Sequence, residues 1–160
     1  MKYVLYFSIF VFTIGLNQKL FAQDIEFQKK SLMYDFENAI HFTIDQSIIA
    51  DLNGDGANDT AIFRKENKTS GIIINHGRTK ETVRIGFGND FAHLTDVNWV
   101  DFWGLVKDST TYEMIFDETD ILGDTIIRLE NPSIVVRKEE AGVGIITFKN
   151  GTYKWIHQSD

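Results

Sequence analysis

Short segments in which hydrophobic and polar residues alternate follow one another along most of the chain after residue 38. They are rich in Ile, Val, Thr, Phe and Tyr, and clusters of Gly, Asn and Asp separate them. This alternation, bounded by turn-forming residues, is typical of β-strands. It predicts strands at 39–50, 59–65, 71–75, 81–86, 111–117, 124–130, 133–138, 143–149 and 152–158. We therefore expect a mainly β fold (β-rich α+β), built as a compact antiparallel sheet or meander of about eight or nine short strands.

The last two segments carry the clearest hairpin signal. Asn-Gly at 150–151 favours a two-residue type I′ turn, because both turn positions need positive φ. The turn sets the register, so Phe148 should face Tyr153 and Ile146 should face Trp155. These four side chains then share one face of the hairpin, which we expect to pack on the core.

One segment has the period of a helix instead. Within 93–108, Trp99, Phe102, Trp103 and Val106 recur at spacings of three and four residues, which places them on one helical face. The pattern predicts one short helix packed on the sheet. An aromatic surface for a sugar or peptide is the alternative interpretation, and it makes Trp99 and Trp103 candidate ligand-binding residues.

The first 22 residues have the layout of a secretory signal peptide. Lys2 precedes an uncharged run at 4–16, and the small side chain of Ala22 suits the last position before cleavage. The run is shorter than the roughly 20 residues of a membrane-spanning helix, although an uncleaved anchor is the competing interpretation. We expect 1–22 to be removed and 23–160 to form a single β-rich domain, exported to the periplasm or secreted, with no stable membrane anchor.

The predicted exported chain is acidic and lacks cysteine. Without Lys2 and Lys19, 14 basic residues remain against 23 acidic residues, a net charge of −9. An acidic surface repels nucleic acid, so we expect no nucleic-acid partner. The absence of cysteine excludes disulfides, thiolate zinc sites and a cysteine nucleophile. The four histidines also lack the HExxH spacing of zinc enzymes.

The most specific chemistry of the chain lies in an acidic loop, 51–59, between two predicted strands. Oxygen-bearing side chains recur there at every second position, and Gly56 stands where the chain must turn sharply. Ca²⁺ takes six to eight oxygen ligands, so this spacing predicts a calcium site; an ion-free polar turn is the alternative. The predicted ligands are the side chains of Asp51, Asn53, Asp55 and Asp59 and the backbone carbonyl of Ala57.

The loop is not an EF-hand, because that motif needs a bidentate Glu at its twelfth position, where this chain has Ile62. "DLNGDGANDTAIF" instead resembles the calcium loop of FG-GAP/VCBS-type repeats, which reads D-x-D/N-x-D-G-x-x-D between two strands. The resemblance spans about 46–76, with Thr60 as a departure, and implies the same five ligands. A propeller needs several blades of about four strands each. We therefore expect one loop within a single compact domain, not a full propeller.

The C-terminal part, from "LENPSIVVRKEE" onward, resembles small secreted bacterial proteins that carry one such loop, and no function can be carried over from them. No G-x-S-x-G elbow or phosphate-binding glycine loop occurs in the chain. The leading hypothesis is an exported, non-enzymatic, calcium-binding β domain that binds a protein or glycan. The alternatives are a small secreted hydrolase with an acidic cleft and an inhibitor or immunity-type protein that covers an enzyme.

Overall fold

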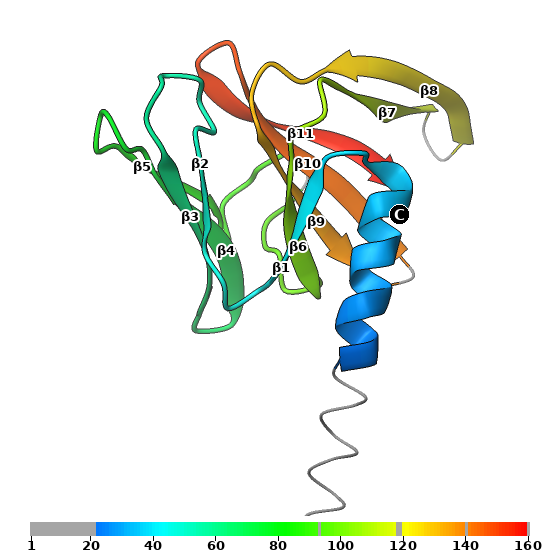
Figure 1. The fold of residues 1–160 in the computed structure, drawn as a ribbon, viewed down its shortest axis with the longest axis horizontal. Helices are drawn as coiled ribbons and strands as arrows, with labels where there is room; N and C mark the ends of the chain where they lie inside the picture. Colours follow the sequence, from blue (N-terminus) through cyan, green and yellow to red (C-terminus); the bar gives the residue numbers. More distant parts are fainter. Residues whose placement is uncertain (1–21, 93, 118–119, 140, 160) are drawn as a thin grey trace, which may run out of the picture.

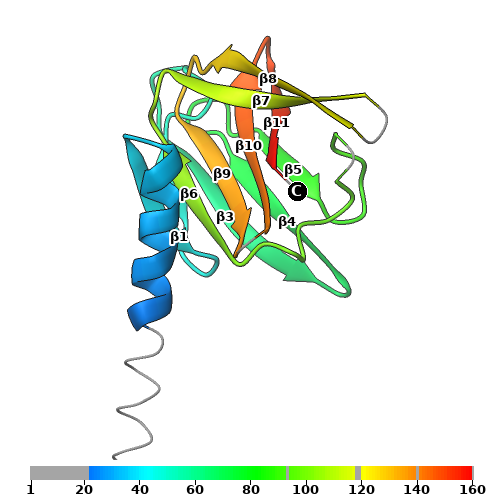
Figure 2. The same cartoon turned by 90° about the vertical axis from the view of Figure 1, so that its right-hand side faces the viewer.

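The computed structural model describes residues 22–92, 94–117, 120–139 and 141–159, which form three layers (Figure 1). A five-stranded antiparallel sheet, ordered β1-β6-β9-β10-β11, lies in the middle. A four-stranded antiparallel sheet, ordered β2-β3-β4-β5, covers one face. The helix over 22–35 and the two-stranded β7-β8 ribbon lie against the other face (Figure 2).

The strands confirm the predicted mainly β class, and in the described part of the chain they form open sheets and no propeller. Their bounds are β1 (Ala39–Thr43), β2 (Ile48–Ala50), β3 (Asp59–Glu66), β4 (Thr69–Asn75), β5 (Thr82–Gly86), β6 (Phe102–Val106), β7 (Thr110–Asp117), β8 (Asp120–Arg128), β9 (Ser133–Lys138), β10 (Ala141–Lys149) and β11 (Thr152–Ser159). The segment 39–50, predicted as one strand, divides into β1 and β2. A turn at 44–47 separates them, and the two strands join different sheets.

Two hydrophobic clusters hold the layers together, one on each face of the middle sheet. The cluster between the two sheets includes Ile48, Leu52, Ala61, Phe63, Ile72, Ile74, Ile85, Trp103, Leu105, Ile134, Val136, Ile146 and Tyr153. The cluster beneath the helix includes Leu32, Phe36, Phe102, Val106, Leu129, Val135, Ile145 and Ile156. Burial of this apolar surface is the main force that joins the layers.

The predicted helix over 93–108 is wrong. His93 lies outside the described residues, and Phe102–Val106 forms β6, a central strand with all five residues buried. Trp103 points toward the four-stranded sheet, whereas Phe102 and Val106 point toward the helix. A strand buried on both faces loses the alternation of apolar and polar residues, and its spacing then mimics a helical face.

The helix over 22–35, which packs on the outer face of the middle sheet, was not predicted. Leu32 and Phe36 enter the cluster there. The Arg137 guanidinium of β9 donates to the Ser31 carbonyl at 2.8 Å and pairs with the Asp35 carboxylate at 2.5 Å. Nearly all of the predicted signal peptide (1–21) lies outside the described residues. Within the described residues, no helix is long and apolar enough to span a membrane.

The C-terminal hairpin has the predicted register. Phe148 pairs with Tyr153 and Ile146 pairs with Trp155, and Asn150 and Gly151 have φ values of 53° and 81°. All four paired side chains belong to or pack against the cluster between the sheets. The Asn-Gly signal thus predicted the turn, the pairing and the buried face correctly.

A candidate metal loop and the pocket beside it

The acidic loop 51–59 lies between β2 and β3, which pair antiparallel, so strands flank it as predicted. Gly54 and Gly56 have positive φ values of 75° and 84°, the conformation for which glycine is preferred. The Asp51 carboxylate accepts hydrogen bonds from the backbone N–H groups of Gly54, Asp55 and Gly56 at 2.8–3.0 Å. One carboxylate thus shapes the whole turn.

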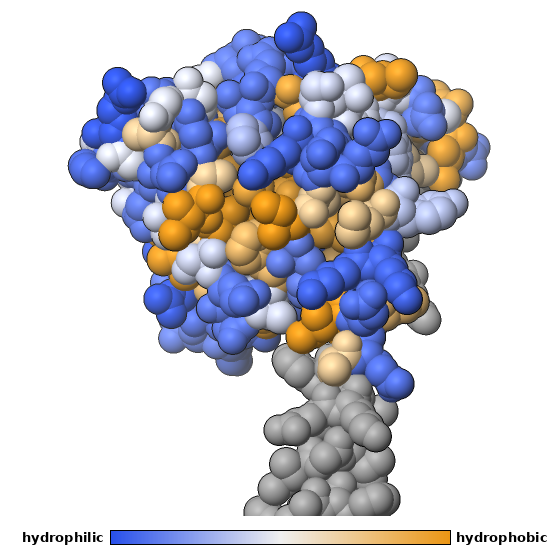
Figure 3. Space-filling view, viewed as in Figure 1, coloured by the Kyte–Doolittle hydropathy of each residue, from blue (hydrophilic) through white to orange (hydrophobic). Residues whose placement is uncertain are grey.

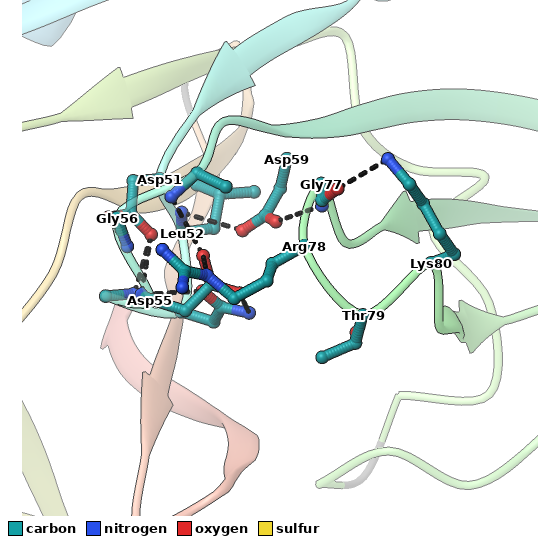
Figure 4. A network of polar contacts seen from close by, with 12 residues as sticks. Asp51, Leu52, Asp55, Gly56, Asp59, Gly77, Arg78, Thr79 and Lys80 are labelled. Atoms are coloured by element: carbon teal, nitrogen blue, oxygen red, sulfur yellow. Dashed lines mark hydrogen bonds and ion pairs between the residues drawn. The ribbon is translucent and has the colours of Figure 1, made fainter.

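Asp59 ties the loop to the neighbouring turn 76–81, which connects β4 and β5 (Figure 4). Its side chain is 0% exposed. One carboxylate oxygen accepts from Leu52 N at 2.9 Å, and the other accepts from Gly77 N at 2.8 Å. Both oxygens of this buried carboxylate thus have a backbone N–H partner, as buried polar groups require.

Arg78 extends from the same turn over the loop and brings a positive charge to it (Figure 4). Its Nε atom lies 3.7 Å from the Asp55 carboxylate, but its side chain is 63% exposed. Asp55 also accepts from Ala57 N at 2.9 Å and from the Asn53 side-chain amide at 3.3 Å. Because solvent screens an exposed ion pair, Arg78 offsets only part of the negative charge of the loop.

The donors of the loop fit a hard cation such as Ca²⁺ in their chemistry. A carboxylate has about four lone-pair positions, and the hydrogen bonds of Asp51, Asp55 and Asp59 leave some of them available. In the described part of the chain, however, no three His, Cys, Asp or Glu side chains already converge into a metal-holding group. Binding an ion therefore requires the carboxylates to turn from their N–H partners toward a common centre.

A pocket of about 500 Å³ opens beside the loop, between β5 and the β10–β11 hairpin. Asn53 and Asp55 belong to both the loop and the pocket wall. The remaining lining residues are His76, Thr79, Glu81, Val83, Arg84, Ile85, Phe91, Phe148, Gly151, Thr152 and Tyr153. The candidate metal loop and the pocket therefore share two wall residues, so a change of charge in the loop alters the electrostatic potential in the pocket.

A buried histidine–tyrosine pair forms part of this wall. His76 and Tyr153 are 5% and 6% exposed, and the His76 Nε2 atom lies 3.0 Å from the Tyr153 hydroxyl oxygen. The Glu81 carboxylate lies 4.0 Å from His76 Nδ1. Burial, followed by the negative charges of Asp59, Asp51, Asp55 and Glu81, raises the pKa of the Tyr153 phenol well above its usual value. Tyr153 therefore stays neutral at physiological pH and cannot act as a phenolate nucleophile there.

The two tryptophans singled out as candidate ligand-binding residues lie apart from the pocket and differ from each other. Trp103 is 0% exposed, and its indole N–H donates to the Thr43 carbonyl at 2.9 Å. Trp99 is half-buried and packs edge-on against Trp155, with ring centroids 6.5 Å apart. Trp103 is thus a core residue that no ligand reaches in this structure, and the two rings form no exposed strip.

Sequence reasoning located the loop but missed the residues that surround it. Arg78 and Glu81 lie about 20 residues downstream of the loop, and no local pattern connects them with it. Tyr153 was expected in the core, but not as the partner of His76. Only the antiparallel pairing of β3 with β4 brings the turn 76–81 back to the loop.

No protein-family model, no curated protein and no solved structure matches this chain, so its function has to be inferred from its own residues.

Proposed function

We propose that this protein is an exported, non-enzymatic β domain that binds Ca²⁺ in the loop 51–59 and presents the surface around that loop to a protein or glycan partner. The ligands would be Asp51, Asn53, Asp55 and Asp59 through their side chains and Ala57 through its carbonyl. The ion would neutralise clustered carboxylates and order the loop; it would supply no chemical step.

One observation carries this proposal: all five predicted ligands lie in one tight turn. Oxygen-bearing side chains stand at alternate positions of a tight turn between two paired strands, and Asp51 and Asp59 fix its two ends. Three carboxylates within nine residues repel one another, and the cationic side chain that approaches them, Arg78, is exposed. A divalent cation relieves that repulsion more effectively than a screened surface arginine does.

Calorimetric titration of the purified protein with CaCl₂ after EDTA treatment tests the proposal. We expect one ion per chain with a Kd of about 10⁻⁴–10⁻³ M, the range of extracellular calcium modules. Asp55→Asn should abolish the binding heat, because it removes a ligand charge.

Asp45→Asn is the matched control, since Asp45 is an exposed aspartate in the turn between β1 and β2. It should leave calcium binding unchanged. Equal calcium uptake by the unaltered protein and Asp55→Asn would show that the ions associate only with the acidic surface, and the proposal would fail.

A further inference from the structure

We propose that the pocket beside the loop binds a small organic cation with an apolar body, such as an aralkylammonium ion. The inference goes beyond calcium binding and does not depend on it, because most of the pocket lies outside the loop. It rests on the lining of the pocket, which combines carboxylates with apolar and aromatic side chains.

The apolar lining residues are Val83, Ile85, Phe91 and Phe148. Val83, Phe91 and Phe148 pack against the core cluster but stay partly exposed. Phe148 also meets the Tyr153 ring edge-on, with centroids 5.1 Å apart. Partly exposed apolar and aromatic walls of this kind favour a ligand with an apolar body, and ring faces attract a cation.

The pocket also has acidic lining residues. Asp55 and Glu81 both line it, together with the Asn53 amide and the His76–Tyr153 pair. The carboxylates of the loop also raise the pKa of the Tyr153 phenol, after burial itself, as expected for a pocket wall with negative charges nearby. A negative potential beside an apolar wall selects a positively charged group over a neutral or negative one.

The two arginines near the pocket leave this charge largely uncompensated. Arg84 lines the pocket, but its guanidinium pairs with Glu66 at 2.7 Å and lies 4.1 Å from the centre of the Phe87 ring. Arg78 approaches Asp55 only at 3.7 Å and is mostly exposed. The Glu81 carboxylate lies 4.0 Å from the basic nitrogen Nδ1 of His76. An incoming ammonium group can therefore pair with Glu81 or with Asp55.

The volume of the pocket suits such a ligand. At about 500 Å³ it falls within the range of small-molecule sites. The pocket lies between β5 and the β10–β11 hairpin, so its walls come from both sheets and are held by the core between them. An apolar ring can lie against Phe148 or Val83 while its ammonium group pairs with one of the two carboxylates of the lining.

The test uses phenethylammonium, 2-phenylethanol and 3-phenylpropionate, which share a phenyl ring and differ in charge. Each is titrated into the ¹⁵N-labelled protein in EDTA, and backbone amide shifts are followed by NMR. We expect phenethylammonium to cause saturable shifts at His76, Thr79 and Thr152. The other two probes should bind at least about threefold more weakly, because a partly screened ion pair changes affinity by about that factor. Because no calcium is present, the result is independent of the calcium proposal.

Two exposed positions supply the variants. Glu81→Gln should weaken phenethylammonium binding about threefold, and Thr79→Arg should abolish it by placing a cation and bulk in the pocket. Glu37→Gln, the same charge change at an exposed position that follows the helix, should have no effect. Equal affinity for all three probes, shifts away from the pocket, or no saturation up to about 10 mM would overturn the proposal.

Discussion

At the residue scale, Asp59 links the acidic loop to the rest of the molecule. Its buried carboxylate accepts one hydrogen bond from within the loop and one from the turn 76–81. Leu52, whose N–H makes the first of these bonds, places its own side chain in the core between the sheets. The loop is thus anchored to the core by a side chain and by a charge-assisted hydrogen bond, even without an ion.

Replacing Asp59 with alanine should therefore destabilise the protein in EDTA as well as in calcium. The change leaves two N–H groups without acceptors, and we expect a loss of about 2–4 kcal/mol in the free energy of unfolding. Urea denaturation measures it. Asp90→Ala removes an exposed carboxylate and should change stability by less than about 0.5 kcal/mol. Equal effects of the two substitutions would refute the anchoring role of Asp59.

The Tyr153 phenol gives a pH prediction. Its pKa in the folded protein is raised by burial and by the nearby carboxylates, whereas the pKa of an unfolded tyrosine is about 10. This difference in pKa stabilises the folded protein fully below about pH 10. The stabilisation is lost as the pH rises through the pKa of Tyr153 in the folded protein. In an alkaline titration followed by phenolate absorbance, one tyrosine should ionise at a higher pH than an unfolded tyrosine does. This high-pH ionisation step should be absent in Tyr153→Phe. A high-pH ionisation step that persists in Tyr153→Phe would contradict this assignment.

At the element scale, β6 shows how the middle sheet accommodates two partners. Trp103 and Leu105 face the four-stranded sheet, while Phe102 and Val106 face the helix. Between them Gly104 lets the helix approach closely. A Cβ atom there would lie 2.9 Å from a Leu32 methyl group of the helix and 2.9 Å from the Ile40 carbonyl oxygen.

Gly104→Ala should therefore push the helix away from the sheet. We expect a loss of about 1–3 kcal/mol in the free energy of unfolding, as in other overpacked cores. Thr125→Ala on the exposed strand β8 is the control and should have little effect. Chemical denaturation compares the two; a Gly104→Ala protein as stable as the control would contradict the packing described for this element.

The same elements show what the sequence could predict. The Asn-Gly turn determined the pairing of β10 and β11, because a two-residue type I′ turn permits only one register. By contrast, β6 was mistaken for a helix, because a strand buried on both faces has no polar residues to mark its period. The loop could be located, since its ligand spacing is local; the pocket could not, because its walls come from distant segments.

At the scale of the whole molecule, the layers leave apolar side chains of the β7–β8 ribbon uncovered. The β7–β8 ribbon extends from the middle sheet and carries apolar side chains that face solvent (Figure 3). They are Ile115, Phe116, Ile121, Leu122 and Ile126. The loop and pocket instead depend on the contact between the two sheets, so disturbing the ribbon should leave both sites intact.

The whole fold also sets how strongly an ion can stabilise it. A calcium site with a Kd of about 10⁻⁴–10⁻³ M adds about 1–2 kcal/mol at several millimolar calcium, which corresponds to a rise in melting temperature of about 3–8 °C for a domain of this size. The gain should vanish when a ligand is removed, even where the substitution itself also lowers stability.

Thermal unfolding in EDTA and in millimolar CaCl₂, for the unaltered protein, Asp55→Ala and the control Asp45→Ala, tests the central claim most directly. We predict a calcium-dependent rise in melting temperature in the unaltered protein and the control, and none in Asp55→Ala. The same melting temperature with and without calcium in the unaltered protein would show that the aspartates form only a turn, and the proposed function would be contradicted.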